Sequence, residues 1–156
     1  AVQHDAVCPV GFVIRRGGCT VGIATDLGDV NALARQRLCD CSALILESNY
    51  DAKMLRDSDR QIYLKRRILG RHGHLDNVVA LKALEELLTP RTSVLMLAHL
   101  SSECNCPELV RNLFETKLRE LGRTDLRFEV LSQERPVGPV DLFDHMVAEE
   151  YGYAAN

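Results

Sequence analysis

The sequence predicts an α/β fold in which one layer of helices packs on a β-sheet. Two observations lead to this prediction. Two short apolar segments separated by a pair of glycines lie near the start of the chain, as in a β-hairpin. After them, short apolar segments alternate with segments whose apolar residues recur at helical spacing. The 156 residues, 46% of them hydrophobic, are enough for one domain with a buried core.

The first elements are expected to be a hairpin followed by a helix. Residues 11–16 and 19–24 have the pattern of its strands, and Gly17-Gly18 provide the backbone freedom that a tight turn requires. The helix should cover about residues 30–38, with Asp29 as the N-cap, because a carboxylate can accept a free N–H of the first turn.

The middle of the chain predicts a buried strand and three helices. Residues 42–46 are continuously apolar, which is typical of a strand covered on both faces, and the polar residues 47–51 follow it. The helices are expected at about residues 52–56, 60–69 (closed by Gly70) and 75–88.

The last third predicts a strand, a helix and a second strand. Residues 93–98 have the pattern of a buried strand, and residues 107–121 should form an amphipathic helix with proline in its first turn. Residues 126–131 alternate apolar with polar side chains, which indicates a half-exposed edge strand. We therefore expect one unit over residues 1–134 and a loosely packed C-terminal tail over residues 135–156.

The overall composition limits the class of protein. No apolar run approaches the ~20 residues that a membrane-spanning helix needs. The first residues have neither the basic nor the apolar region of a signal peptide. We therefore expect a cytoplasmic protein with no membrane partner. The net charge of -3 gives no overall electrostatic attraction to nucleic acid.

One local exception to this charge balance is a basic cluster that precedes His74. A solvated helix face is the simpler interpretation of such a cluster, and a phosphate-rich substrate near His74 would favour the alternative. The cluster comprises Lys65, Arg66, Arg67, Arg71 and His72.

The chain has six cysteines, and without a signal peptide they suggest reduced thiols rather than a disulfide scaffold. Four of them form two C-x-C pairs, Cys39 with Cys41 and Cys104 with Cys106. Structural zinc sites usually have wider spacings such as C-x-x-C. We therefore interpret these cysteines as small, partly buried side chains rather than zinc ligands.

Three side chains of the kind that binds metal ions lie where a predicted strand gives way to a loop. They are Asp26, His99 and His4, whose strand would lie upstream of Ala1. A carboxylate and two imidazoles suit a divalent metal ion, and a loop leaves them facing a cleft rather than a core. The pattern therefore suggests metal-assisted hydrolysis.

Each of these three residues also has a purely structural interpretation. Asp26 is suited to an Asx turn or a cap. A single histidine such as His99 is as often a hydrogen-bonded structural residue as a ligand. A histidine four residues from a terminus, such as His4, is ordinarily disordered.

His74 is a candidate catalytic residue, because it lies between Gly73 and the start of a predicted helix. In one interpretation this junction is only capped, with Asp76 and Asn77 as partners of the free backbone groups. In the other, His74 and the helix N-terminus together face an anionic group such as a phosphate.

The order of these residues along the chain resembles the metallo-β-lactamase superfamily. Within it, the chain resembles the branch of bacterial phosphodiesterase- and exonuclease-like proteins related to YycJ/WalJ, from His4 to about Leu131. The segments that carry the resemblance are His4-Asp5-Ala6, Ala24-Thr25-Asp26-Leu27-Gly28, Leu46-Glu47-Ser48-Asn49-Tyr50-Asp51, Gly73-His74-Leu75-Asp76-Asn77 and Ala98-His99-Leu100-Ser101.

The resemblance implies a role for each candidate residue. It implies that His4 and His99 are metal ligands and that Asp26 is the carboxylate that bridges two divalent metal ions, zinc or manganese. It implies that His74 faces the substrate phosphate and protonates or stabilises the leaving group. Tyr50 stands where family members often have histidine, so a hydrogen bond from its hydroxyl is the only polar role that we assign to it.

The H-x-H-x-D-H signature of the family is absent from this sequence. The resemblance therefore implies only the C-terminal half of an αββα sandwich, with a mixed sheet and helices on one face. Its expected partners are the missing N-terminal half or a second chain, including a second copy in a homo-oligomer, and a phosphodiester substrate such as nucleic acid. The isolated chain is then expected to be inactive.

The main hypothesis is a metal-dependent hydrolase of phosphodiester bonds, a nuclease or small phosphodiesterase, in the full-length protein. The alternative is a non-catalytic half-fold or interaction module that packs against a partner chain. A small-molecule-binding α/β domain without metal would leave the order of the motifs unexplained.

Overall fold

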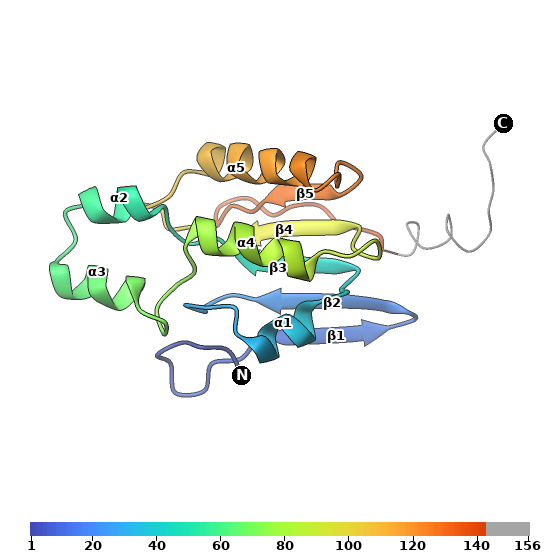
Figure 1. The fold of residues 1–156 in the computed structure, drawn as a ribbon, viewed down its shortest axis with the longest axis horizontal. Coiled ribbons are helices and arrows are strands. Elements are labelled where there is room, and N and C mark those ends of the chain that lie inside the picture. Colours follow the sequence, from blue (N-terminus) through green and yellow to red (C-terminus); the bar gives the residue numbers. More distant parts are fainter. Residues whose placement is uncertain (143–156) are drawn as a thin grey trace.

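A computed structural model describes residues 1–142, and its central feature is a five-stranded mixed sheet (Figure 1). Across the sheet the strands follow sequence order: β1 (Phe12–Arg16), β2 (Cys19–Ala24), β3 (Ala43–Glu47), β4 (Val94–Ala98) and β5 (Arg127–Val130). β1 pairs antiparallel with β2, and the other neighbours pair in parallel. The carboxyl ends of β2 to β5 therefore meet at one edge, on the left in Figure 1.

The expected hairpin is present in β1 and β2. Gly17 and Gly18 join the strands with φ angles of 53° and 81°, which a residue without a Cβ adopts at little cost. The predicted edge strand is β5, and each of its residues is partly exposed.

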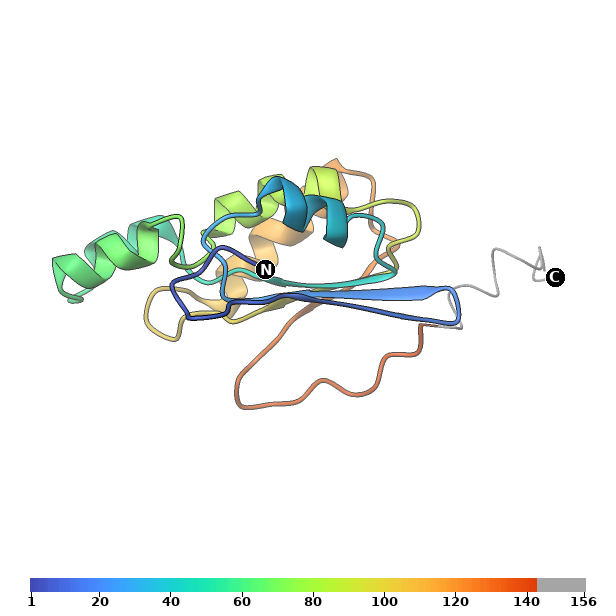
Figure 2. The same ribbon diagram turned by 90° about the horizontal axis from the view of Figure 1, so that it is seen from below.

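The helices form one layer on the sheet, as predicted, and Figure 2 shows α1, α4 and α5 on the same face. The helices are α1 (Ala32–Leu38), α2 (Ala52–Asp57), α3 (Ile62–Leu69), α4 (Asn77–Leu87) and α5 (Pro107–Glu120). α2 and α3 extend beyond the carboxyl edge of the sheet (Figure 1).

The core lies between the sheet and this helix layer. On β3 and β4 the residues that face the helices are leucines, and each is at most 1% exposed. They pack with the buried apolar faces of α4 and α5, for example with Leu84 and Phe114. Burial of a leucine or phenylalanine side chain contributes about 1.5–3 kcal/mol. The leucines on the strands are Leu44, Leu46, Leu95 and Leu97.

The opposite face of the sheet is apolar and is not covered by any helix of residues 1–142. Phe12 and Ile14 of β1 point to this side and are 57% and 55% exposed. The segment of residues 131–142 runs past this face (Figure 2), and Pro139 to Leu142 line a groove with Ile14 and Val21.

The α2–α3 segment leaves the sheet region and returns to the same place. Tyr50, before α2, and Asp76, after α3, form an isolated parallel bridge. On either side of it, the Asn49 N–H donates to the Leu75 carbonyl at 2.9 Å and the Asn77 N–H donates to the Tyr50 carbonyl at 3.0 Å. The two ends of this excursion are thus fixed side by side.

The expected N-cap of the first helix was wrong. α1 begins at Ala32, and the Asn31 side chain caps it by accepting the Ala34 N–H at 2.9 Å. Asp29 instead lies 3.6 Å from the Arg71 guanidinium. Asn and Asp are about equally good caps, so the sequence favoured neither strongly.

Two further expectations concern the C-terminal tail and membrane-spanning helices. Residues 143–156, most of the expected tail, lie outside the described residues. Within the described part, no helix is long and apolar enough to cross a membrane.

Candidate functional site

All four candidate site residues line one cleft of about 400 Å³ at the carboxyl edge of the sheet. Asp26 follows β2 and His99 follows β4, so two strands that are not neighbours place their loops beside β3, which lies between them. His4 comes from the N-terminal loop, and His74 from the loop before α4. The topology thus joins residues that are 95 positions apart.

The two residues that follow the strands share an unusual backbone conformation. Asp26 and His99 have φ angles of 56° and 58°, and among the described non-glycine residues only Asp40 also has a positive φ. The left-handed region costs an L-residue roughly 1–2 kcal/mol. Both residues line the cleft, and contacts beside them hold this conformation: the Leu27 N–H donates to Glu47, and the Asn49 side chain donates to the His99 carbonyl.

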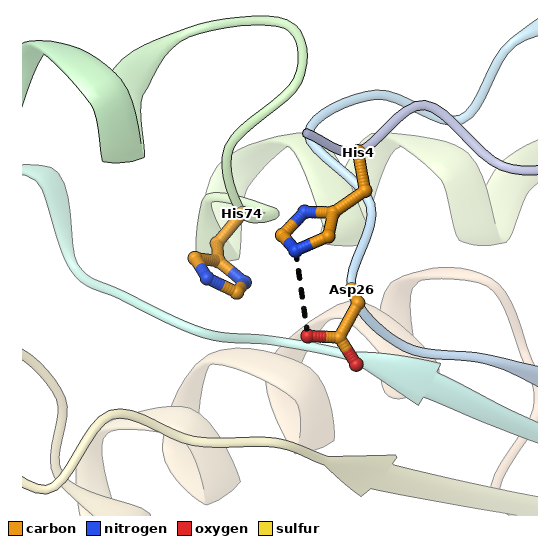
Figure 3. A group of neighbouring side chains, drawn as sticks. All are labelled: His4, Asp26 and His74. Atoms are coloured by element: carbon orange, nitrogen blue, oxygen red, sulfur yellow. Dashed lines mark ion pairs between the residues drawn. The ribbon is translucent and has the colours of Figure 1, made fainter. Parts of the chain in front are cut away.

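His4 is fixed in place although it is near the N-terminus. Its Nδ1–H donates to the carbonyl of Gly73 at 2.8 Å, which leaves Nε2 as the nitrogen with a free lone pair. This Nε2 lies 3.8 Å from Oδ1 of Asp26 and 3.6 Å from Oδ1 of Asp5 (the contact to Asp26 is dashed in Figure 3). The side chain is only 12% exposed, so the expectation of a disordered histidine was wrong.

His74 lies between the other two histidines and does not cap the helix. Its ring centroid is 5.0 Å from that of His4 and 5.2 Å from that of His99. The cap of α4 is instead Asp76, whose carboxylate accepts the Val78 N–H at 2.6 Å. The predicted cap of this junction by Asp76 is therefore confirmed, and the His74 ring lies beside His4 and Asp26 in the cleft (Figure 3).

The buried carboxylate of Glu47 connects two of the histidines. Its Oε1 accepts the Nδ1–H of His74 at 2.8 Å and the Nδ1–H of His99 at 2.7 Å. Its Oε2 accepts the backbone N–H of Leu27 at 2.8 Å, next to Asp26. Glu47 is 0% exposed, and its three hydrogen bonds join the segments that carry Asp26, His74 and His99.

These hydrogen bonds determine the charge states around Glu47. Burial alone would raise the pKa of the Glu47 carboxyl, but the hydrogen bonds from His74, His99 and Leu27 outweigh burial and lower this pKa. The hydrogen bond to Glu47 raises the pKa of His99 against the opposing effect of its partial burial. Glu47 thus remains an anion and orients both rings.

A polar network anchors the loops around the site. The Asn49 Nδ2–H donates to the carbonyl of His99 at 2.6 Å, next to its left-handed backbone. The Ser48 hydroxyl donates to Oδ1 of Asn77 at 2.6 Å, and Asn105 donates to the Ser48 carbonyl at 2.9 Å. Because the partners are buried, each lost hydrogen bond would leave a polar group unsatisfied.

The loop of His74 depends on close backbone packing at Gly73. A Cβ at this position would lie 2.2 Å from the Ile68 carbonyl oxygen and 2.3 Å from that of Arg67. Only glycine fits there without a backbone shift. Since the Gly73 carbonyl also holds His4, this one residue positions two of the site histidines.

The donor atoms of the site could hold a metal ion. His4, Asp26 and His74 each offer one ligand atom within 4.8 Å of the others, and Glu47, His74 and His99 form a second such group. Imidazole with carboxylate is a donor set that suits zinc or manganese. The hydrogen bond from Nδ1 of His4 to a carbonyl is the kind of outer contact that orients a ligating histidine. The residues therefore fit a divalent metal.

The stretch from His72 to Asn77 matches H-x-H-x-D-H except at its last position, where Asn77 replaces histidine. The fold gives its members other roles. His72 is exposed, Asp76 caps α4, and Asn77 is 1% exposed and hydrogen-bonded to Ser48. Among the described residues only His74 of this stretch belongs to a group that could share a metal ion.

Tyr50 and the cysteines take no part in the cleft lining that the described residues form. Tyr50 is 4% exposed and packs with Leu55, Ile68 and Cys104. Burial, with Asp76 and Glu47 nearby, raises the pKa of Tyr50 to about 12, so its hydroxyl stays neutral. The potential metal groups in the described part contain none of the six cysteines.

Sequence reasoning missed Glu47 as a functional residue. It recognised only a polar cluster after a strand, although Glu47 proves to be the last residue of β3. An available signal was its position directly after a continuous apolar run, where a charged residue is buried only if it has partners. Arg60 and Arg67 also line the cleft, and the predicted basic cluster contained only the second of them.

The chain matches no family model, but it is similar to known proteins. It is 34% identical to exodeoxyribonuclease YycJ of Bacillus anthracis over 121 residues, which is 78% of this chain and 46% of the relative. It is 32% identical to exodeoxyribonuclease WalJ of Streptococcus pneumoniae over 125 residues, which is 80% of this chain and 45% of that relative. The chain thus spans about half the length of the curated relatives that it matches.

Proposed function

The chain belongs to the YycJ/WalJ branch of the metallo-β-lactamase superfamily, and we propose that it contributes part of the active site of a metal-dependent exodeoxyribonuclease. The observation that carries this proposal is the convergence of His4, Asp26, His74 and His99 on one cleft. The relatives are named exodeoxyribonucleases, and this supplies the substrate class of the proposal, a deoxyribonucleic acid strand.

We assign metal binding to His4, Asp26 and His99. Asp26 lies near both histidines, with its Oδ1 3.8 Å from His4 Nε2 and 3.8 Å from His99 Nδ1. Because the His99 Nδ1–H donates to Glu47, Nε2 is the nitrogen of His99 that is left for a metal ion. Its carboxylate has two oxygens and can therefore bind on two sides. When bound, two divalent ions (zinc or manganese) would polarise a phosphate oxygen and lower the pKa of a water molecule.

We assign proton transfer to His74. Its Nδ1–H is directed at Glu47, so its Nε2 is the nitrogen available to hold a proton at the leaving oxygen of a phosphodiester. Glu47 fixes the orientation of this ring through one oxygen that it also shares with His99. The same carboxylate thereby keeps the proton-transfer residue and a metal ligand at a constant separation.

The complete site is expected to need a further protein segment. Two metal ions need more ligands than His4, Asp26 and His99 provide, so the isolated chain should lack efficient hydrolysis. The open apolar face of the sheet, with Phe12 and Ile14 more than half exposed, supports a partner layer on that side. We propose the other half of a sandwich, in the same polypeptide, as this layer.

The second candidate is a non-catalytic module that packs against a partner chain. The same open face favours it, because an apolar sheet face requires cover whether or not the cleft is catalytic. The two candidates predict different sequences upstream of this chain in its reading frame. An upstream, in-frame H-x-H-x-D-H motif is expected for the nuclease and not for the module.

The decisive experiment uses the protein encoded by the complete reading frame that contains this chain. Release of nucleotides from a linear, end-labelled DNA is measured with manganese or zinc for the wild type, for Asp26→Asn and for Asp59→Asn as an exposed control. We expect a loss of at least about a hundredfold for Asp26→Asn, since a metal-ion contribution of several kcal/mol disappears. Equal rates for the wild type and Asp26→Asn would refute the proposal.

A further inference from the structure

Helix α3 and Arg60, which lies two residues before the helix begins, form one wall of the cleft. Arg60, Leu64 and Arg67 line the cleft on this side. Leu64 and Arg67 are three residues apart on α3 and therefore share one helix face. The wall lies outside the sheet edge, where α2 and α3 extend beyond the strands (Figure 1).

The other basic residues of this region have other contacts. Lys65 donates to the carbonyls of Arg56 and Ser58 at 2.6 Å and 2.5 Å, at the end of α2. Arg71 lies 3.6 Å from the carboxylate of Asp29. Of the basic cluster that the sequence shows, Arg67 is the member whose side chain belongs to the described lining of the cleft.

Both arginines of the wall contact carboxylates from loops that also carry site residues. Nε and Nη2 of Arg67 donate to the two oxygens of Asp5 at 2.5 Å and 3.1 Å, and Asp5 directly follows His4. Nε of Arg60 donates to Oε2 of Glu103 at 3.0 Å, in the loop after His99. The paired contact of Arg67 with Asp5 has the two-pronged form in which a guanidinium also binds a phosphate.

We propose that Arg60 and Arg67 bind backbone phosphates of the nucleic-acid strand next to the bond to be cut, with the strand replacing Asp5 on Arg67. The inference rests on the proposed nuclease function. The net charge of -3 gives the protein no general attraction for a polyanion, so an attraction must come from local cations. Arg67 is suited to this exchange because its side chain is 62% exposed and its partner Asp5 is 33% exposed.

The exchange is favourable because one phosphodiester strand offers several phosphates along the same wall. Asp5 provides a single carboxylate to a single guanidinium, and solvent screens this pair because both side chains are partly exposed. Its loss is therefore readily offset by a phosphate on each arginine. Leu64, between the two arginines in sequence, adds an apolar surface against which a sugar or base can pack.

The test is a binding measurement that does not depend on cleavage. The protein encoded by the complete reading frame is titrated into a fluorescein-labelled single-stranded DNA 20-mer in EDTA, and the fluorescence anisotropy is followed at several salt concentrations. We expect Arg67→Gln and Arg60→Gln each to raise the Kd by about five- to tenfold and to reduce the slope of log K against log salt by about 0.7, the value for one phosphate on a single strand.

Arg66→Gln is the matched control. Arg66 neighbours Arg67 on α3 and is exposed, but the described cleft lining does not include it. The same charge is lost there, so a direct contact predicts less than about a twofold change in Kd, whereas general charge attraction predicts equal effects. Equal effects of Arg66→Gln and Arg67→Gln would overturn the proposal. So would the absence of binding by the wild type at low salt.

Asp5→Asn separates phosphate binding from a structural role of Arg67. If Asp5 competes with the strand, Asp5→Asn should lower the Kd several-fold, while Asp59→Asn, which removes an exposed charge elsewhere, should not. A Kd that is unchanged or raised by Asp5→Asn would mean that Arg67 only ties down the His4 loop. Arg67→Lys, which keeps the charge and loses the fork, serves if Arg67→Gln does not fold, and it should bind more weakly than the wild type.

The two proposals fail in different ways. If DNA binding depends on Arg67 but cleavage by the complete protein is unaffected by Asp26→Asn, the nuclease site is refuted. The proposed binding of phosphates by Arg60 and Arg67 then still stands. Cleavage that depends on Asp26, with binding and KM unaffected by Arg60→Gln and Arg67→Gln, would refute the wall alone.

Discussion

The side chain of His4 donates a hydrogen bond of 2.8 Å to the carbonyl of Gly73, and this bond joins parts of the chain that are 69 residues apart. It ties the N-terminal loop to the loop of His74. The geometry of the cleft therefore depends on Gly73, which has no side chain and acts through its backbone carbonyl.

Gly73→Ala should therefore disturb both fold and site. The added Cβ would lie 2.2 Å from the Ile68 carbonyl oxygen, so the loop must shift, and we expect a loss of about 1–3 kcal/mol in the free energy of unfolding. Urea unfolding of the chain measures this loss. Gly138→Ala is the control, because a Cβ there meets no atom within 4 Å, and a similar loss in both variants would contradict the prediction.

Glu47→Gln should weaken metal binding without removing a cleft residue. An amide cannot accept from His74, His99 and Leu27 as a carboxylate does, so the two rings lose their fixed orientation. Replacement of such an outer contact typically costs about 10–100-fold in metal affinity. Calorimetric titration with zinc measures the affinity, with the exposed Glu86→Gln as control, and an unchanged Kd for Glu47→Gln would contradict the assignment.

Metal content per chain is expected to depend on the proposed ligands. After dialysis without chelator, zinc or manganese retained by the wild-type chain should fall in Asp26→Asn and in His99→Gln and remain in Asp59→Asn, as measured by inductively coupled plasma mass spectrometry. Retention in all variants would place the metal elsewhere. A wild-type chain that retains no metal would show that the ligands of this chain are insufficient by themselves.

Stability should vary with pH through His99. The hydrogen bond to Glu47 raises the pKa of His99 in the folded chain above the usual 6.5. The stabilisation of the fold by protonated His99 is therefore complete below the pKa of the unfolded state and is lost as the pH rises through the pKa of the folded state. We expect the metal-free chain to lose stability as the pH rises above about 6.5. Urea unfolding in EDTA at constant ionic strength measures this change. His99→Gln should show a smaller decline over the same window, and an equal decline would exclude His99 as its source.

The isolated chain should associate through the open face of the sheet. Phe12 and Ile14 leave apolar surface exposed on a face that no described helix covers, and light scattering at increasing concentration should show a rising mass. Phe12→Ser with Ile14→Thr should reduce the association. Ile62→Ser with Tyr63→Ser, at exposed positions of α3, should not, and a monomeric wild type would contradict the prediction.

Much of the fold was predictable because its elements have strong local patterns. The strands β3 and β4 are continuous apolar runs, and the hairpin turn has two glycines where a positive φ is needed. The N-cap of α1 was not predictable, since Asp29 and Asn31 are about equally suited and tertiary contacts decided between them.

The candidate site was predictable as a set of residues but not as a geometry. The order of His4, Asp26, His74 and His99 along the chain resembled a family, and the sheet does bring these residues to one cleft. The role of Glu47 was not predictable, because nothing local shows that a buried carboxylate will meet two histidines that lie 27 and 52 residues further along the chain. Such partners become neighbours only through the parallel strand order.

The closure of the α2–α3 excursion by the Tyr50–Asp76 bridge has a consequence for how this protein can change over evolutionary time. Because the two ends of the excursion are fixed to each other, its interior can be lengthened, shortened or recharged with little effect on the strands that carry Asp26 and His99. The wall of the cleft and the strand-end residues Asp26 and His99 can therefore evolve separately. Relatives that keep the same strand-end residues can differ in the substrates that their walls accept.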